Sequence, residues 1–180
     1  MELLSDLIAD ALEWQKKVKR NFTKMRKGLE KIRKSKTTWP CLLPKEDMAE
    51  EDLELWLRYL RGNKCSFHHL FGMTDDQREL ALEVLIYKVM DQLPPGQSID
   101  KHTANWIYGI LACIEFPLHL YLCVILRDLC KSADEVRSHL DDLPENEIVE
   151  AGTPLNIISI LVTQYFDQSN VVPLGYSFPG

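Results

Sequence analysis

The sequence predicts an all-α domain, an irregular bundle of about six or seven helices with a long basic helix at its N-terminus. Three observations favour this class. Only 8 Gly and 9 Pro among 180 residues leave few turns for many short strands. Apolar residues make up 46% of the chain and charged residues 27%, the ordinary mixture of a globular domain. Apolar residues three and four positions apart, the helical period, recur along most of the chain.

The first expected helix covers residues 2–36. Its apolar stripe consists of Leu4, Ile8, Ala11, Val18, Phe22, Met25, Leu29 and Ile32. Basic residues outside the stripe are Lys16, Lys19, Arg20, Lys24, Lys27, Lys31 and Lys34. Residues 1–40 hold 11 Lys and Arg against 5 Asp and Glu, a net charge of +6, whereas residues 41–180 hold 10 against 22, a net charge of −12. The basic side is either a solvated face or a surface for an acidic or nucleic-acid partner.

Turn and capping residues divide the rest of the chain. The connection over 37–45 contains two prolines, and an apolar segment lies at 65–73. Thr74 with Gln77 three places on predicts a capping box at a helix start. Ser98 or Asp100 is expected to cap a later helix, and Pro154 to be the first residue of the last one. The helices expected after the connection cover residues 46–61, 74–93, 100–115, 118–140 and 154–168. Residues 1–168 are predicted to form a single helical domain and 169–180 a flexible tail.

No pattern in the sequence supports catalysis, a cofactor or a metal site. No two histidines lie four apart with a Glu between them, and no glycine-rich phosphate loop or nucleophile elbow occurs. We therefore expect neither an enzyme nor a bound cofactor or metal. The five cysteines are odd in number and mostly lie in apolar runs, which favours buried free thiols in a reducing compartment.

A stretch of 21 residues, 106–126, is long enough to span a bilayer. Glu115, Pro117 and His119 fall near its middle, and a central acid alone costs about 2.5–3.5 kcal/mol on insertion. Two buried helices that meet at a bend fit this pattern better than a membrane span.

The last eighty residues carry more apolar side chains than one helix face needs. Over 100–115 the apolar residues cover nearly the whole helix circumference, and residues 120–126 and 155–166 show the same pattern. Either these helices form a tight core together, or they leave a groove for a guest helix. In the second case Gly109, with Ala112 one turn on, would allow a close approach.

Three motifs resemble one known family. Residues 106–118, W-I-Y-G-I-L-A-C-I-E-F-P-L, are similar to its segment W-L-Y-A-L-L-A-C-L-E-x-P-L. Residues 127–137 (RDLCKSADEVR) resemble its R-x-L-A-R-x-C-x-E-V-R stretch, and residues 155–168 (LNIISILVTQYFDQ) its L-N-x-L-x-x-L-V-x-x-Y-F-D-Q end. The chain is thereby identified, over about residues 10–168, as similar to the Gemin two (SMN-interacting protein) family, a core subunit of the survival motor neuron complex.

The resemblance implies a non-catalytic adaptor, cytoplasmic and nuclear, for assembly of spliceosomal small nuclear ribonucleoproteins (snRNPs). It implies two partners: an amphipathic helix from near the N-terminus of the survival motor neuron protein, and Sm proteins, above all the Sm D-one/D-two pair. The family's N-terminal arm, which clasps the remaining Sm subunits, is expected to be missing or to lie outside this sequence. Direct RNA binding is not expected, and a nucleic-acid-binding module acting through the basic first helix is the alternative function.

The residues expected to line the guest-helix groove are Asn105, Trp106, Gly109, Ala112 and Cys113, with Tyr165 or Phe166. Trp106 and Phe166 are equally compatible with plain core positions. At position 105 the family carries an Arg that pairs with an acid of the partner helix, so Asn105 is expected to weaken or replace that contact.

Overall fold

The computed structural model describes residues 2–44 and 52–168, and within these ranges it consists of helices without a strand. The predicted all-α bundle is confirmed. The α-helices are α1 (Glu2–Lys34), α2 (Leu53–Gly62), α3 (Phe67–Gly72), α4 (Asp75–Val84), α5 (Lys101–Ala112), α6 (Leu120–Ser138) and α7 (Glu145–Ile160). A π-helix η1 (Leu85–Val89) and a 3-10 turn η2 (Met90–Gln92) extend α4, and a π-helix η3 (Leu161–Tyr165) extends α7.

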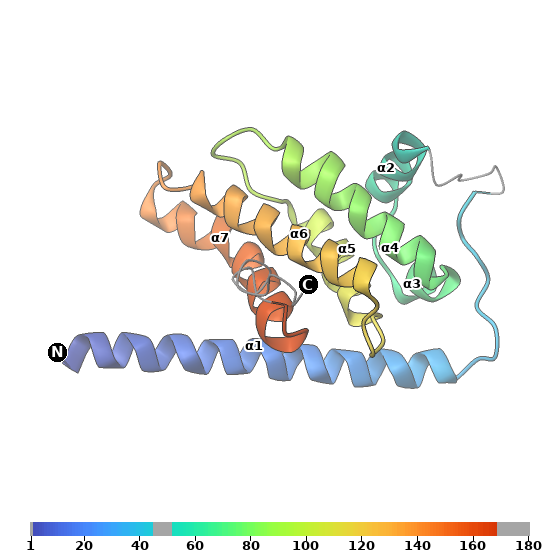
Figure 1. Ribbon diagram of the computed structural model, residues 1–180, viewed down its shortest axis with the longest axis horizontal. Helices are drawn as coiled ribbons and strands as arrows, with labels where there is room; N and C mark the ends of the chain where they lie inside the picture. The colour runs from blue at the N-terminus through green and yellow to red at the C-terminus, as the bar shows by residue number, and fades with distance from the viewer. Residues whose placement is uncertain (1, 45–51, 169–180) are drawn as a thin grey trace, which may run out of the picture.

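Helix α1 runs along one edge of the bundle, and its N-terminal part extends beyond the other helices (Figure 1). The predicted long basic helix is confirmed. Phe22 is fully buried, and its ring lies edge-on to Tyr108 and Tyr165, with centroids 5.4 and 4.7 Å away. Edge-to-face aromatic pairs add about 0.5–1.5 kcal/mol each to the free energy of burial. This cluster therefore fixes the middle of α1 on α5 and η3.

Side-chain caps begin the short helices α2, α3 and α4. Asp52 accepts a hydrogen bond from the backbone N–H of Leu55, and Ser66 accepts one from His69. The predicted capping box between Thr74 and Gln77 is present with both of its hydrogen bonds. The predicted start of the second helix at residue 46 lies outside the described residues.

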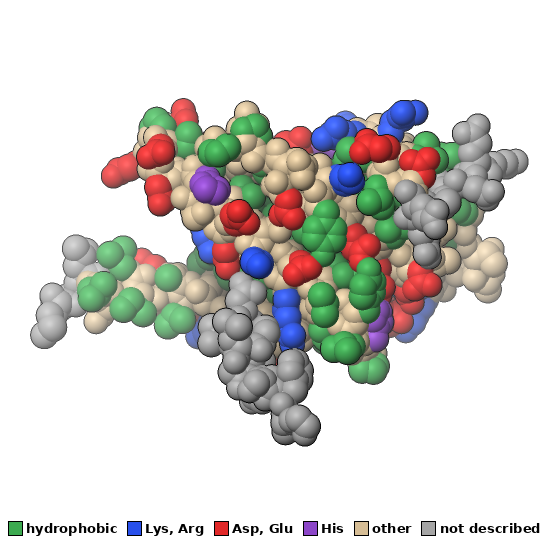
Figure 2. Space-filling model, turned by 45° about the horizontal axis from the view of Figure 1, so that its top comes forward, with side chains coloured by type: hydrophobic (Ala, Val, Ile, Leu, Met, Phe, Trp, Pro, Cys, Tyr) green, Lys and Arg blue, Asp and Glu red, His purple; other side chains and the backbone are tan. Residues whose placement is uncertain are grey.

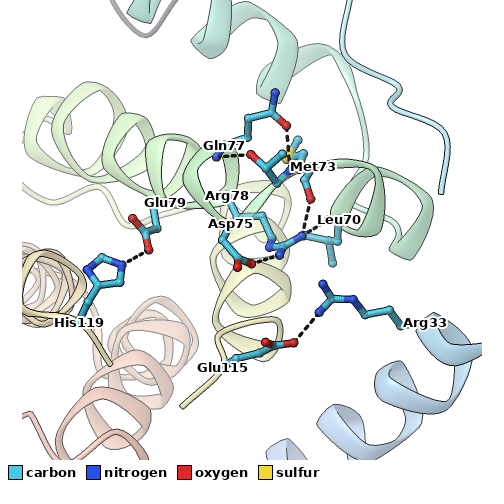
Figure 3. A network of polar contacts seen from close by, with 10 residues as sticks. Arg33, Leu70, Met73, Asp75, Gln77, Arg78, Glu79, Glu115 and His119 are labelled. Carbon is cyan, nitrogen blue, oxygen red and sulfur yellow. Dashed lines mark hydrogen bonds and ion pairs between the residues drawn. The ribbon is translucent and has the colours of Figure 1, made fainter. Parts of the chain in front are cut away.

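A buried arginine joins α3 to α4 (Figure 3). The Arg78 side chain donates hydrogen bonds from Nη1 to the carbonyl oxygens of Leu70 and Met73, both at 2.7 Å, and forms an ion pair with Asp75. Two backbone carbonyls at the end of α3 thus have a charged donor. This network fixes the short helix α3 against the first turn of α4.

Helix α5 lies at the centre of the bundle. Of the two expected caps it uses Asp100, which accepts from the backbone N–H of Thr103. Helix α6 begins at Leu120 after the predicted bend, and the Phe116–Pro117 peptide bond in this bend is cis. No helix within the described residues is both long and apolar enough to cross a membrane.

The predicted start of the last helix at Pro154 is wrong. Helix α7 begins at Glu145, and Pro154 lies inside it. Acidic residues in the first turn favour a helix start at Glu145. The Ser98 hydroxyl also donates a hydrogen bond to the carbonyl of Ala151 at 2.6 Å. These contacts keep the turn before the proline helical, although the ring removes one backbone donor. The predicted flexible tail, 169–180, lies outside the described residues.

Candidate protein-docking surfaces

Two residues of the predicted groove are packed against other parts of this chain. Trp106 is 0% exposed, and its Nε1 donates to the carbonyl of Asn63 at 2.9 Å. At Gly109 an added Cβ would lie 2.8 Å from Sγ of Cys65 and 3.1 Å from Leu70. The close approach expected at this glycine is real, but the segment that approaches is α3 with the residues before it. These two side-chain positions belong to the core of the bundle.

The other predicted groove residues are divided among three places. Phe166 is buried beside Phe22, as the core interpretation expected. Ala112, Cys113 and Tyr165 line a cleft on the side of α1, described below. Asn105 is exposed on α5. These residues therefore do not form one open groove.

A file of exposed apolar side chains lies on the N-terminal part of α1. We call this file the α1 apolar extension, and its members are Leu4, Leu7, Ile8, Leu12 and Trp14. Leu4 is 64% exposed and Ile8 53%. At about 100° per residue, all five lie within a quarter turn of the direction in which Phe22 points into the core. Figure 2 shows the hydrophobic side chains gathered on this projecting end of the helix.

The sequence contains this stripe, but it does not show that the bundle ends before the stripe does. A helix of 33 residues is about 50 Å long, longer than the helices that pack against it. The side of α1 that buries Val18 and Phe22 therefore continues into a segment where no described element covers it. Large apolar side chains that continue the core-facing side of a helix are typical of a protein-binding surface.

A second exposed apolar surface lies at the start of α6. We call it the α4–α6 surface, and its members are the exposed Leu120, Tyr121 and Val124 of α6 with the half-buried Glu79 and Glu83 of α4. Leu120 is 77% exposed. Nε2 of His119 lies 2.5 Å from Glu79, and the Tyr121 hydroxyl donates to Glu83. Of the three stretches predicted to be apolar nearly all round, residues 120–126 keep large apolar side chains exposed, whereas those of 100–115 and 155–166 are mostly buried.

Acidic groups line the edge of this surface along α6 as well. The Tyr87 hydroxyl donates to Asp128 at 2.5 Å, and burial, followed by the hydrogen bond to Asp128, raises the pKa of Tyr87 above its ordinary value. Within the described part of the chain, no Lys or Arg forms an ion pair with Glu79, Glu83 or Asp128. The surface therefore combines apolar side chains with negative charge.

The chemistry of the thiols points away from a nucleophilic site. Burial raises the pKa of Cys65 to about 12 and also raises the pKa of Cys113, whereas reactive thiols have lowered pKa values. Cys113 and Cys130 are buried, Cys65 and Cys123 are half-buried, and Cys41 is exposed. The described residues contain no group of three or more His, Cys, Asp or Glu side chains placed to hold a metal ion.

Comparisons with known proteins give three relatives with the same description. The chain is 24% identical over 162 residues to Gem-associated protein 2 of Drosophila melanogaster, covering 88% of this chain and 63% of the relative. Identity to the Xenopus laevis protein of that name is 19%, covering 94% and 72%, and to the Mus musculus protein 24%, covering 89% and 65%. The chain thus spans about two thirds of the length of these relatives.

A solved structure shares the fold. One chain of "The 8S snRNP Assembly Intermediate" superimposes with a TM-score of 0.67 at 24% identity, covering 89% of this chain and 73% of that one. Residues 4–169, nearly the whole described region, match the family of survival motor neuron (SMN) interacting protein 1 (SIP1). On this match the chain belongs to the SMN interacting protein 1 family.

Proposed function

We propose that this chain is a non-catalytic adaptor in the assembly of snRNPs. It binds the N-terminal amphipathic helix of the survival motor neuron protein at one surface and Sm proteins at another. The family description, an SMN interacting protein, and the name of the structural relative, an snRNP assembly intermediate, support this role. An adaptor needs two separate docking surfaces, and the α1 apolar extension and the α4–α6 surface are both exposed among the described residues.

The α1 apolar extension is the observation that carries the proposal. Its side chains are large, they follow a helical period, and they continue the buried side of α1 beyond the polar Gln15. A partner helix laid along them would bury an apolar face on Leu4, Ile8 and Leu12, the mode in which amphipathic helices occupy grooves. Burying one such side chain fully is worth about 1.5–3 kcal/mol, so a few of them supply most of a specific affinity.

The α4–α6 surface is the proposed docking site for an Sm protein, with the Sm D-one/D-two pair as the expected occupant. Its apolar side chains, Leu120 and Val124, lie one helical turn apart on α6. The carboxylates of Glu79 and Glu83 beside them favour a partner that brings basic side chains to this edge.

A peptide of the survival motor neuron protein's N-terminal helix, titrated by calorimetry against the full chain, tests the first surface. The double variant Ile8→Ser/Leu12→Ser should weaken binding at least tenfold, because two apolar anchors become polar. Val149→Ser is the matched control, since Val149 is also exposed but lies on α7. Equal affinity for the Ile8→Ser/Leu12→Ser variant and the control would contradict the assignment of this surface.

The second surface has a separate test. Leu120→Ser/Val124→Ser should lower co-purification of the Sm D-one/D-two pair while leaving the helix peptide's affinity unchanged. Loss of both partners in this variant, with an unchanged melting temperature, would mean that the two surfaces are one site.

A further inference from the structure

The cleft beside the C-terminal half of α1 gathers positive charge. It encloses about 880 Å³ between α1, the connection that follows α1, the end of α5 and Tyr165. Its basic lining residues are Arg26, Lys27, Arg33, Lys34 and Lys36, and its acidic lining residues are Glu30 and Glu115. Five cations against two carboxylates give the lining a net charge of +3, whereas the whole chain carries −6. The cleft is therefore a local exception in an acidic protein, and an anionic ligand is the kind that it attracts.

Two guanidinium groups are already positioned at the cleft. Arg26 donates from Nη1 to the carbonyl of Leu111 at 3.4 Å, and its charged end lies 5.7 Å from the ring centroid of Phe116 and 5.5 Å from that of Tyr165. Arg33 pairs with Glu115, another lining residue of the cleft, at 2.9 Å (Figure 3). Because this pair is largely exposed, it is worth about 1 kcal/mol or less, and a phosphate can replace the carboxylate.

Aromatic rings lie among the cations. Phe116 is 54% exposed, although its ring also packs on Phe166. Trp39 lines the opposite side, with the Lys36 ammonium 4.9 Å from its ring centroid. Grooves that bind single-stranded nucleic acid combine such rings, on which bases stack, with cations that follow the backbone. A peptide made only of Asp and Glu would use the cations but would have no contact for the exposed ring of Phe116.

A row of basic side chains runs along the outer side of α1 toward the cleft. Lys16, Arg20, Lys24 and Lys27 are exposed and lie three or four residues apart on one side of the helix. Neighbours in this row are about 4.5–6 Å apart along the axis, comparable to the spacing of phosphates in an extended strand. A strand whose bases enter the cleft can therefore continue along α1 with one cation for nearly every phosphate.

We infer that this cleft, with the basic row of α1, binds single-stranded RNA. The cleft uses the C-terminal half of α1 and the end of α5, whereas the proposed docking surfaces use the N-terminal half of α1 and the start of α6. A variant can therefore lose RNA binding and keep partner binding, or lose partner binding and keep RNA binding.

Fluorescence anisotropy of a fluorescein-labelled 12-nucleotide oligouridine, titrated with the full chain, tests the inference. Since each single-strand phosphate contact contributes a slope of about −0.7 to the salt dependence, the four cations of the basic row predict roughly fiftyfold weaker binding at 200 mM than at 50 mM NaCl. Lys27→Glu/Lys34→Glu should weaken binding by more than tenfold. The control Lys101→Glu/Lys131→Glu makes the same charge change on exposed residues of α5 and α6 and should change affinity less than twofold.

Two further measurements separate RNA from other anions. Phe116→Leu keeps an apolar side chain but removes the stacking ring, and it should weaken oligouridine binding roughly fivefold or more. Polyglutamate and a blunt RNA duplex of equal charge should compete poorly. Equal loss in the two charge-reversal variants, salt-independent binding, or competition by polyglutamate or duplex as strong as by oligouridine would overturn the inference. Ile8→Ser/Leu12→Ser should bind oligouridine as the unaltered chain does.

Discussion

Arg78 is the buried charge on which the α3–α4 corner depends. Its guanidinium is the donor for two carbonyls of neighbouring backbone, so Arg78→Met would leave both acceptors without that donor. We expect the variant to lose about 2–4 kcal/mol of unfolding free energy in urea denaturation. Asp75→Asn is the control, because the Asp75 side chain is largely exposed and its removal should cost about 1 kcal/mol or less. Similar losses in the two variants would mean that the ion pair, and not the carbonyl contacts, stabilises the corner.

Two helical glycines should respond to alanine in opposite directions. At Gly109 the new Cβ would meet Cys65 and Leu70 at less than normal contact distance, so we expect Gly109→Ala to destabilise the chain by about 1–3 kcal/mol. At Gly28 nothing lies within 4 Å, so Gly28→Ala should stabilise it by about 0.5–1 kcal/mol through helix propensity. Thermal unfolding measures both. Adding Cys65→Ala should restore part of the loss at Gly109, and no such coupling would place the clash elsewhere.

His69 gives the fold a pH dependence. Burial, followed by the neighbouring His68, lowers the pKa of His69 from its model-compound value of 6.5. A base with a lowered folded-state pKa binds fewer protons when folded, so its contribution is fully present above about pH 6.5 and is lost as the pH falls below that value. The melting temperature should therefore fall between pH 7.5 and 5.5, and His69→Asn should reduce this fall. His139→Asn, at an exposed histidine, is the matched control variant.

At the scale of the helices, local signals predicted the starts of α4 and α5 but not the start of α7. The capping box at Thr74 and the cap at Asp100 were visible because each requires only side chains three residues apart. The start of α7 was not visible, because Pro154 is a strong local signal and the contact that overrides it, from Ser98, comes from 53 residues away along the sequence. The π-helical turns after α4 and α7 had no local signal either.

Pro154, inside α7, is expected to lower the stability of the chain. Pro154 cannot donate to the carbonyl one turn before it, so Pro154→Ala should add a backbone hydrogen bond and gain helix propensity. Part of this gain is offset because proline also restricts the unfolded chain. We expect a net stabilisation of about 1–2 kcal/mol by chemical denaturation. A loss of stability would show that the ring itself packs usefully at this position.

At the scale of the whole molecule, the sequence predicted which helix faces are apolar but not what covers them. Trp106 was a candidate for a guest helix because its helix is apolar nearly all round, yet residues from α3 and the segment before it seal that side. The apolar stripe of α1 runs along the whole predicted helix in the sequence, yet its N-terminal part projects from the bundle. Both differences depend on where distant segments end in space, which periodicity does not contain.

Helix α1 should therefore divide into a part that stabilises the bundle and a part that does not. Deleting residues 1–12 removes mostly exposed side chains and should cost less than about 1 kcal/mol of unfolding free energy. Phe22→Ala, in the buried part, should cost about 3–5 kcal/mol. Denaturant titration compares them, and the deletion should also abolish binding of the survival motor neuron peptide. A large loss of stability in the deletion would mean that the extension is covered by its own chain.

The α1 apolar extension also limits how much of this protein a cell can hold without its partner. A chain without a bound partner helix exposes this apolar helix end, which can associate with the same surface of other copies as the concentration rises. Synthesis of this chain in excess of the survival motor neuron protein should therefore lead to aggregation or to degradation by quality-control proteases. We expect the two proteins to be kept near equal amounts in the cell.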